Sequence, residues 1–561
     1  MDKTAGQDPG HSDATRLLCV AAYVDAAFRR QVIEELVEHE ERPVAPSIGC
    51  DIVPVLAHAL RARRGEALAG LGAAVVWGGF AAAAAHYAAD GYGVRGTALA
   101  AIVYASASAV MWQERSLVQG HGVYDWGRAA RNRGRPPAGP YRLGRLLPVL
   151  PRAVLLWYWA VTVTLVVRPE ARWSALVFPL VLVVPVATHQ VWVDRVLRKE
   201  LSREAFARAG RRPLPDTRRY RRLREAIDRE QFSPLAVYAP ARPLVGFGLT
   251  YDAWSFALEL EPKKRQEDGT APAAPARLTN REVLDLIRPQ VAGLRAPGAV
   301  PGRDRLRQLR VDEFVCLPAR TARDMATSAG GVGRNARDPA LREPDRLRET
   351  LRRAVDDDGE GRRHFLRVRV DSWDGQLMVT VLVRVHTQGG MLVLEVTPFV
   401  LPPVREHYEV LADAASRRGR EPVGAALRAL ASGPASSFAA LLALPLTVAV
   451  SCRTWLSRPA HEPPDGPLLS VRELGSAEQV TLFHEMDVSR YVKTVQDRIA
   501  HGVLEVLRAK GYDTGEFEQQ IVNVERGGIF VGAMSGGVAS TGERATITQQ
   551  GGEHRGRGGR S

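Results

Sequence analysis

The stretch LAGLGAAVVWGGFAAAAAHYAA, at Leu68–Ala89, decides how this chain is organised, because it is an apolar run of membrane length. Three further apolar segments follow it at Val94–Trp112, Leu147–Val167 and Trp173–Val193. Each is close to the roughly 20 apolar residues that an α-helix needs to cross a hydrocarbon core about 30 Å thick. The sequence therefore predicts a membrane protein with four transmembrane helices, paired as two hairpins, in residues 65–193.

The basic residues predict the orientation of these helices. Basic clusters precede the first segment, fill the connection between the second and third, and follow the fourth, whereas the connections near Asp90–Gly93 and Arg168–Arg172 are only a few residues long. Because basic residues accumulate on the cytoplasmic side, we expect a multi-pass protein of the plasma (inner) membrane with both termini in the cytoplasm. The residues that set this orientation are Arg61, Arg63, Arg64, Arg115, Arg128, Arg131, Arg133, Arg135, Arg142, Arg145, Arg195, Arg198, Lys199 and Arg203.

The composition agrees with a membrane anchor that carries a soluble region. The chain has 561 residues, a net charge of +14 and a pI near 9.9. Such a charge can indicate nucleic-acid binding, but the basic residues stand beside the apolar segments, where anionic lipid attracts each of them by roughly 1 kcal/mol. The lipid bilayer and its anionic head groups are therefore the expected partners, and nucleic acid is not expected. Six lysines among the 76 basic residues, with abundant Ala, Gly and Pro, are typical of a GC-rich bacterial genome.

The spacing of residues predicts no metal, cofactor or catalytic site. Cys19, Cys50, Cys316 and Cys452 are far apart, so zinc is not expected and a cytoplasmic location predicts free thiols. The chain has no GxxxxGK[ST] and no HExxH motif. Gly330–Asn335 (GGVGRN) is Gly-rich, but it lies in a polar stretch and not at a strand-to-helix turn. No catalytic residue, cofactor or metal ligand is predicted.

An acidic patch near the N-terminus contains a pair of side chains with metal-ligand spacing. Glu35 and His39 are four residues apart on a predicted helix and could share a metal ion. A solvated helix face is the simpler interpretation, because it needs no second helix. The patch consists of Glu34, Glu35, Glu38, His39, Glu40 and Glu41.

Two loops also have features of a ligand site. Pro243–Gly248 (PLVGFG), followed by Trp254 and Ser255, resembles a lid or ligand loop, but a tight turn entering a strand is the favoured interpretation. Asp371, Trp373 and Asp374 are explained by a hairpin tip without any site.

The soluble parts are predicted from apolar periodicity. An amphipathic helix is expected over 15–41, a second short helix over 51–64, basic helices interrupted by Pro213 and Pro215 over 195–229, and a Pro- and Gly-rich loop over 233–250. The predicted order of parts is 1–14 disordered, 15–64 helical and cytoplasmic, 65–193 transmembrane, 194–232 basic juxtamembrane helices, 233–420 a cytoplasmic α+β domain, 421–485 an apolar segment and linker, 486–512 an amphipathic helix and 513–561 a Gly-rich β-prone tail.

The clearest strand signals lie in the α+β domain. His364–Val370, Leu377–His386 and Met391–Val400 are β-branched and largely alternating, and Asp374–Gly375 and Gln388–Gly390 supply turns between them. They predict an antiparallel sheet with a meander. Strands are also expected at 252–260 and 309–317, and helices at 280–294 and 405–416.

The C-terminal part leaves three alternatives open. Ser436–Ser451 is apolar over about 16 residues, which favours a buried or interfacial helix over a fifth crossing. The helix Asp487–Arg508 has a narrow apolar seam, which either packs on its own domain or associates with a second copy. The tail Ile521–Thr548 is either disordered or stacks with identical tails. A homo-oligomer that associates through this helix and tail is therefore one of the candidate assemblies. The seam consists of Val488, Val492, Val495, Ile499, Val503 and Val506.

Four stretches resemble a family of uncharacterised actinobacterial membrane proteins. They are AAYVDAAFRRQVIEELVEHEERPVAPSIGCDIVPVLAHAL at Ala21–Leu60, Val237–Leu260, His364–Val404, and HEMDVSRYVKTVQDRI at His484–Ile499 with the tail that follows. The resemblance covers most of the chain outside Thr321–Asp345. It implies a short helical region, a pair of membrane hairpins, a cytoplasmic α+β region and a Gly-rich tail, but no activity.

Three functions are compatible with these features. A membrane-anchored scaffold, interaction or sensor protein is favoured, because the spans carry a sizeable cytoplasmic region without a catalytic signature. A channel or transporter built by oligomerisation is disfavoured, because the ionisable residues near the spans, namely His86, Arg95, Arg152 and His189, all lie close to segment ends. A membrane-bound enzyme would need a scattered catalytic set, and no enzyme activity is predicted.

Overall fold

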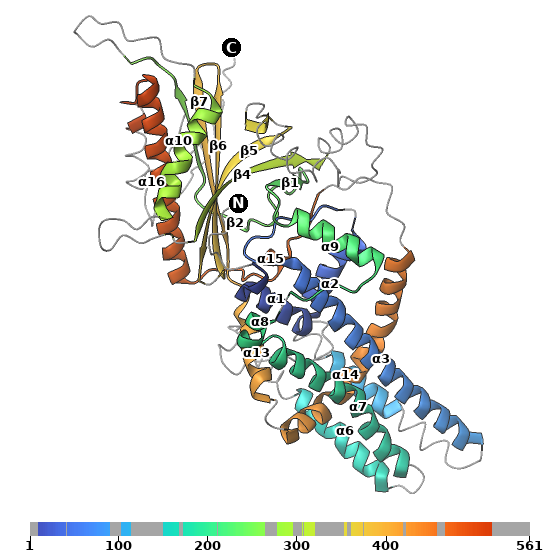
Figure 1. Ribbon diagram of the computed structural model, residues 1–561. Coiled ribbons are helices and arrows are strands. Elements are labelled where there is room, and N and C mark those ends of the chain that lie inside the picture. Colours follow the sequence, from blue (N-terminus) through green and yellow to red (C-terminus); the bar gives the residue numbers. More distant parts are fainter. Residues whose placement is uncertain are drawn as a thin grey trace, which may run out of the picture.

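The molecule has two parts of different character, joined by the N-terminal helices. Figure 1 shows a curled sheet covered by two helices at one end and a bundle of long helices at the other, so an α+β region is present as predicted. The computed structural model describes residues 9–40, 42–89, 102–113, 150–167, 172–209, 211–263, 278–295, 306, 308–319, 353–355, 359, 361–373, 375–418, 422–456, 466–515 and 517–518.

The N-terminal helices form a buried joint between the two parts. The elements involved are α1 (Asp13–Val24), α2 (Ala26–Ile33), the π-helical turn η2 (Glu34–Glu38) and α13 (Glu406–Arg418). The predicted single helix over 15–41 is broken at Asp25, whose carboxylate accepts the backbone N–H groups of Ala27 and Phe28 at 3.0 Å each. The amphipathic pattern is also wrong for α1, which is buried along nearly its whole length because α2, α3 and α13 all pack against it.

Two long helices lead from this joint into the bundle, α3 (Ile52–Ala89) and α7 (Arg172–Lys199). The predicted short helix over 51–64 is the first part of α3, which continues into the first apolar segment without a break. The two helices touch and are antiparallel: a Cβ on Gly65 would lie 2.6 Å from the Trp192 ring, and one on Gly72 would lie 3.0 Å from Pro185. Their inner ends share one apolar core with α1 and α13.

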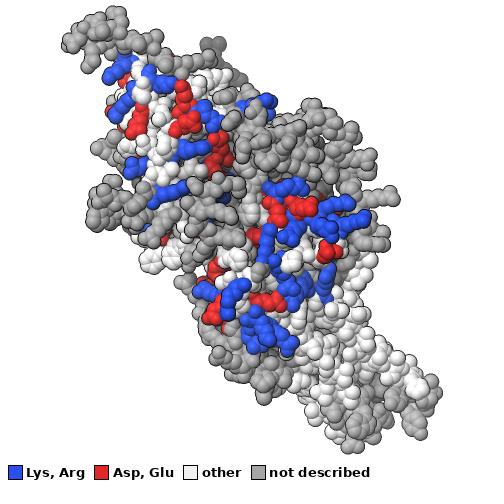
Figure 2. Space-filling view, in the orientation of Figure 1, with Lys and Arg blue, Asp and Glu red and all other residues white. Residues whose placement is uncertain are grey.

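The outer half of the bundle exposes large apolar side chains. α6 (Leu150–Val167) and the helical residues 102–113 pack there with α3 and α7 around Tyr104 and Phe178. Figure 2 shows this end of the molecule without charged side chains among the described residues. The exposed apolar belt consists of Leu68, Leu71, Val75, Ile102, Leu156, Val163, Val167, Val177, Leu180 and Val184.

Two of the described helices are long and apolar enough to cross a membrane, judged by length and composition. They are Ile52–Ala83 within α3 and Leu180–Lys199 within α7. The prediction of four transmembrane helices is therefore not confirmed. The second predicted segment, 94–112, lies largely outside the described residues, and the third corresponds to α6, which has 18 residues.

Another long helix, α14 (Pro422–Leu456), packs on the bundle. It includes the apolar run predicted at 436–451. Among the described residues, its apolar stretch Leu430–Leu442 is too short to count as a candidate membrane span. α14 lies across both α3 and α7: Gly433 faces Val183 of α7, and the Ala440 carbonyl faces Gly70 of α3. The small residues at these two crossings let the helix backbones approach closely.

The basic stretch after α7 forms two helices, α8 (Arg203–Arg208) and α9 (Arg218–Glu230), separated at Pro213 and Pro215 as predicted. The loop predicted over 233–250 contains two short strands, β1 (Leu235–Tyr238) and β2 (Leu249–Thr250). β1 has four residues and β2 has two, which is too few for an alternating pattern to be recognised among the neighbouring prolines and glycines.

The sheet is mixed, whereas an antiparallel sheet was predicted. Its order is β1-β4-β5-β6-β7-β2, with β3 also paired to β7, and β1 is parallel to β4 because the chain reaches β1 from α9 and not through a hairpin. The predicted strands are confirmed and pair antiparallel. Their bounds are β3 (Trp254–Glu259), β4 (Leu309–Pro318), β5 (Arg363–Ser372), β6 (Leu377–Gln388) and β7 (Met391–Leu401).

The two predicted hairpins of the meander differ in outcome. Gly389 and Gly390 form a two-residue turn with φ of 61° and 81° between the paired residues Gln388 and Met391, as expected for a type I′ turn. The turn expected at Asp374–Gly375 is longer, since the last pair of β5 and β6 is Ser372 with Leu377.

One face of the sheet is covered by α10 (Asn280–Ala292) and α16 (Leu482–Lys510). All six seam residues of α16 are buried, and they pack with α10 and the β6–β7 strands in one core. The seam therefore serves the helix's own domain, which was one of the two predicted alternatives, and this face of α16 is not available to a second copy.

Val495→Ala tests this assignment of the seam. Val495 is fully buried, so the substitution is expected to cost roughly 2 to 3 kcal/mol of stability. The mass of the detergent-solubilised protein should stay unchanged, because the seam is internal. Thermal unfolding and light scattering measure the two effects. Lys493→Ala, on the exposed side of the same helix, is the matched control, and a mass that falls only in Val495→Ala contradicts the assignment.

Glu313 of β4 links the sheet to α10. Its surroundings indicate that the stability of the fold decreases at acidic pH. Burial alone would raise its pKa, but the hydrogen bond with His364 and the nearby charge of Arg281, whose Nη1 is 2.9 Å away, bring the pKa to about 2. A carboxyl group with a lowered pKa contributes stability above its ordinary pKa, and this contribution is lost as the pH falls from about 4.5 to 2.

Glu313→Gln is therefore expected to lower the unfolding temperature at pH 7 and to flatten its decline between pH 4.5 and 2.5. Thermal scans across this range measure both effects. Arg229→Gln, an exposed position on α9, should leave the decline unchanged. An identical acid limb in Glu313→Gln and the unmodified protein would show that this carboxylate does not stabilise the fold.

Candidate functional site

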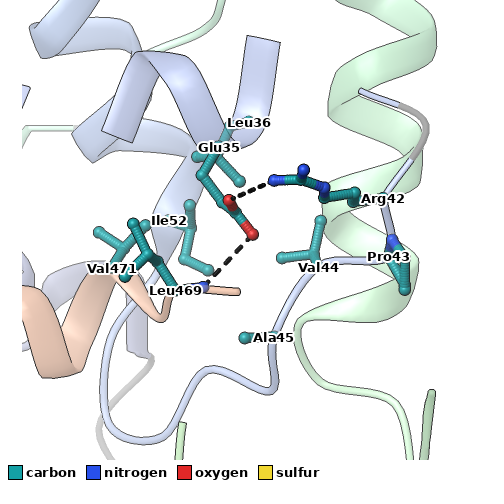
Figure 3. Close-up of a pocket in the computed structure, with 9 residues that line it drawn as sticks. All are labelled: Glu35, Leu36, Arg42, Pro43, Val44, Ala45, Ile52, Leu469 and Val471. Atoms are coloured by element: carbon teal, nitrogen blue, oxygen red, sulfur yellow. Dashed lines mark hydrogen bonds and ion pairs between the residues drawn. The ribbon is translucent and has the colours of Figure 1, made fainter. Parts of the chain in front are cut away.

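The described residues of the acidic patch do not form a group of three or more side chains that could hold a metal ion. Glu35 is 8% exposed, so the predicted solvated face is wrong for this residue. Its carboxylate accepts the backbone N–H of Leu468 at 2.9 Å. It also accepts the backbone N–H of Leu469 at 3.4 Å and lies 3.4 Å from Arg42 Nη1 (Figure 3). The adjoining cavity of about 10 Å³ has room for roughly one water molecule. Glu35 therefore fastens the chain near Leu468 to the N-terminal joint.

The Gly-rich loop at 243–248 is also occupied from within. The backbone N–H groups of Gly246 and Gly248 both donate to Oε1 of Glu473, at 2.8 Å each. Glu473 belongs to the short helix α15 (Val471–Leu474). Burial raises the pKa of Glu473, and the two N–H donors partly offset this rise. Because the loop binds a carboxylate of its own chain, it is a structural turn and not a lid.

The hairpin tip contacts a helix of the same domain. The Trp373 indole N–H donates to Asp487 at 3.0 Å, and its ring meets His484 of α16 edge to face. Trp373 therefore helps to place the start of α16. Asp374 and the Gly330–Asn335 stretch lie outside the described residues.

A pocket that the sequence did not predict lies at the inner end of the bundle. It has a volume of about 350 Å³, within the range of small-molecule sites. Its walls come from α3, the end of α7, α8 and the segment after α8. Pro54, Phe206 and Pro213 supply apolar surface. The lining is Gly10, Pro54, His58, Lys199, Glu200, Phe206, Ala209, Arg211, Arg212 and Pro213.

The lining of this pocket is basic. Lys199, Arg211 and Arg212 contribute three positive charges, and Glu200 contributes one negative charge. Glu200 is held by Arg212 and by Nη1 of Arg61, which lies 2.6 and 2.8 Å from its two carboxylate oxygens. Figure 2 shows basic side chains gathered, with fewer acidic ones, over the helices that lead into the bundle.

Arg211 is fixed from behind by two carboxylates. Its Nε lies 2.5 Å from Asp51, and its Nη2 also contacts Asp228. Burial lowers the pKa of Arg211, but the hydrogen bonds to these two carboxylates more than compensate, so the guanidinium remains charged. By contrast, no residue in the described part of the chain forms an ion pair with the exposed Lys199.

His58 is the buried polar residue at the base of the pocket. It is 3% exposed, and its Nδ1 lies 3.0 Å from the Tyr23 hydroxyl. These residues come from four separate segments, and each has an ordinary neighbourhood in the sequence. In the sequence, only the basic stretch after α7 pointed to this pocket, and attraction to anionic lipid accounted for that stretch equally well.

Comparison with known proteins concerns the other part of the molecule. A family model described as an AbeC-like domain matches residues 253–539, more than half of the chain. The chain belongs to the AbeC-like domain family. No curated protein and no solved structure matches it.

The AbeC-like match begins at β3 and includes β4 to β7, α10, α13, α14 and α16. The resemblance noted in the sequence is therefore supported at the level of a family, whereas the match does not bear on actinobacterial origin or on a membrane location. The pocket, built from residues 10–213, lies outside the AbeC-like match. The match contains strands β3 to β7, whereas β1, β2 and the pocket are formed by the preceding residues.

Proposed function

We propose that the protein is a membrane-anchored scaffold or sensor, in which four membrane crossings hold an AbeC-like α+β region at the cytoplasmic surface. The exposed apolar belt is the observation that carries this proposal. Leu156 is 71% and Val167 is 79% exposed, and the other belt residues lie on the same half of the bundle. A continuous apolar surface of this kind is rare on soluble monomers and is expected where lipid covers the protein.

The distribution of charge supports the proposed orientation. The contact of Gly65 with Trp192 puts the arginines of α3, Arg61 to Arg64, at the same end of the bundle as Arg195 and Arg198 of α7. This is the end that carries the sheet, so the positive-inside rule favours a cytoplasmic AbeC-like region.

The continuity of the helices favours a sensor over a passive anchor. α3 and α7 extend without a break from the apolar belt to the joint, where their ends share a core with α1 and α13. Rigid elements of this kind transmit a displacement between two sites. Self-association remains a prediction that depends on the tail, because the seam of α16 is used within the domain.

Cysteine labelling in spheroplasts tests the topology. In a Cys452→Ser background, which removes the exposed native thiol, Gly91→Cys lies in a predicted outer connection and should react with a membrane-impermeant maleimide. Glu204→Cys, at a side chain that is 89% exposed next to the pocket, should react only after lysis. Equal labelling of both variants in spheroplasts, or release of the protein by an alkaline wash, would exclude the proposed anchor.

A further inference from the structure

We infer that the pocket between α3, α7 and α8 binds a soluble small molecule bearing a phosphate group. The inference rests on the proposed sensor function and names the class of signal that such a sensor would take. Its basis is the lining, in which Lys199, Arg211 and Arg212 face one cavity of about 350 Å³. Charge-assisted N–H···O bonds from such cations are the strongest hydrogen bonds that a phosphate accepts.

The cations differ in how freely they can bind a ligand. Arg211 and Arg212 are oriented by Asp51, Asp228 and Glu200, so their remaining N–H groups are held in place before a ligand arrives. Lys199 has no ion-pair partner among the described residues and is exposed, so a ligand anion can approach it without displacing an internal carboxylate. Preorganised donors beside one unpaired cation reduce the cost of binding an anion.

The walls of the pocket suit an organic phosphate better than the bare ion. Phe206, Pro54 and Pro213 provide apolar surface beside the cations. A site of this volume encloses a small organic molecule, whereas inorganic phosphate would leave much of it to water. His58, fixed by Tyr23 at 3.0 Å, adds a polar ring nitrogen at the base.

The distance of the pocket from the membrane distinguishes between two candidate ligands, a soluble molecule and a lipid head group. His58 precedes Leu68, the first exposed belt residue of α3, by ten residues, which corresponds to a rise of roughly 15 Å. The polar layer on each side of the hydrocarbon core is only about 5 to 8 Å thick. The phosphate of an ordinary phospholipid therefore lies below the pocket, and a ligand dissolved in the cytoplasm is favoured.

Calorimetric titration of the full-length protein with inorganic pyrophosphate tests the inference, in neutral detergent and at fixed ionic strength. Pyrophosphate should bind, and Lys199→Gln should weaken binding at least fivefold, roughly what the loss of one charge-assisted bond predicts. Lys263→Gln removes the same charge at an exposed position outside the pocket and should bind like the unmodified protein. Neither variant removes a partner of a described ion pair, so both should fold.

Several outcomes would overturn the inference. One is that the unmodified protein does not bind pyrophosphate. Another is that Lys199→Gln and Lys263→Gln weaken pyrophosphate binding equally, which would indicate that the net charge of the protein, and not the pocket, attracts the anion. In nanodiscs with 20% anionic phospholipid, pyrophosphate should bind as it does in nanodiscs of neutral lipid. Loss of binding only with anionic lipid would show that head groups occupy the pocket. The labelling experiment reports on the anchor separately, so a failed titration with the expected labelling leaves the scaffold function standing.

Discussion

Arg472→Ala should lower the free energy of unfolding by about 4 kcal/mol, because it leaves several buried acceptors unpaired and opens a cavity. The Arg472 side chain is fully buried. Its Nη2 donates to the backbone carbonyls of Gln376 and Pro402 at 2.7 and 2.9 Å, and its Nη1 donates to the Ser476 hydroxyl at 2.5 Å. The guanidinium thus joins the β5–β6 hairpin, the end of β7 and α15. Thermal and chemical unfolding in detergent measure the loss.

The charge of Arg472 is maintained although it is buried. Burial lowers the pKa of Arg472 to about 10, and the nearby groups of Cys50, Asp371 and Glu473 limit the fall. The side chain is therefore protonated at pH 7, and Arg472→Lys should restore little stability, because an ammonium cannot reproduce the planar fork. Arg242→Ala is the matched control, since Arg242 is exposed and its guanidinium makes one long hydrogen bond among the described residues, to the Leu468 carbonyl at 3.4 Å. A loss of less than about 1 kcal/mol in Arg472→Ala, within the range of surface substitutions, would contradict this role.

The segment around Arg472 shows where prediction from the sequence stops. Residues 466–476 lie in a stretch predicted as a linker, yet they supply Arg472, the Glu473 carboxylate that binds the Gly-rich loop, and the Leu468 N–H that binds Glu35. Each partner lies far away in the sequence. Periodicity reports which face of an element is apolar, but it carries no information on such long-range polar contacts.

The elements that were predicted correctly are those whose pattern is local. β5 and β7 largely alternate, β6 is apolar and β-branched over most of its length, and the seam of α16 repeats from Val488 to Val506, so these elements were visible in the sequence. The short strands β1 and β2 were not, since their pairing is set by β4 and β7. α1 lost its predicted amphipathic character because neighbours from distant parts of the chain surround it. The pocket was missed for the same reason, as its charges converge only in the fold.

Gly248→Ala should lower the free energy of unfolding about as much as Arg472→Ala, because the added Cβ would clash with the backbone of β7. Gly248 has a φ of +91°, and a Cβ there would lie 2.3 Å from the Val400 carbonyl oxygen and 2.8 Å from the Leu401 Cα. Both are backbone atoms of the last residues of β7, so relief requires the β2–β7 pairing to open. Opening would also pull the Gly248 N–H away from Glu473.

Gly511→Ala separates the two components of this effect. Gly511, which ends α16, has a φ of +82°, and a Cβ there would meet nothing within 4 Å. It should therefore cost only the left-handed backbone, about 1 to 2 kcal/mol. Gly248→Ala adds the clash and should cost at least about twice as much, measured by thermal unfolding of both variants in one detergent. If the two variants lose equal stability, the loop at 243–248 adapts to the added methyl group without strain. The N–H donors of Gly246 and Gly248 are then not held in place by β7. The Glu473 carboxylate would then be bound by an adaptable turn. Arg472 would fasten α15 to the sheet together with the backbone hydrogen bonds of Pro403 and Arg405.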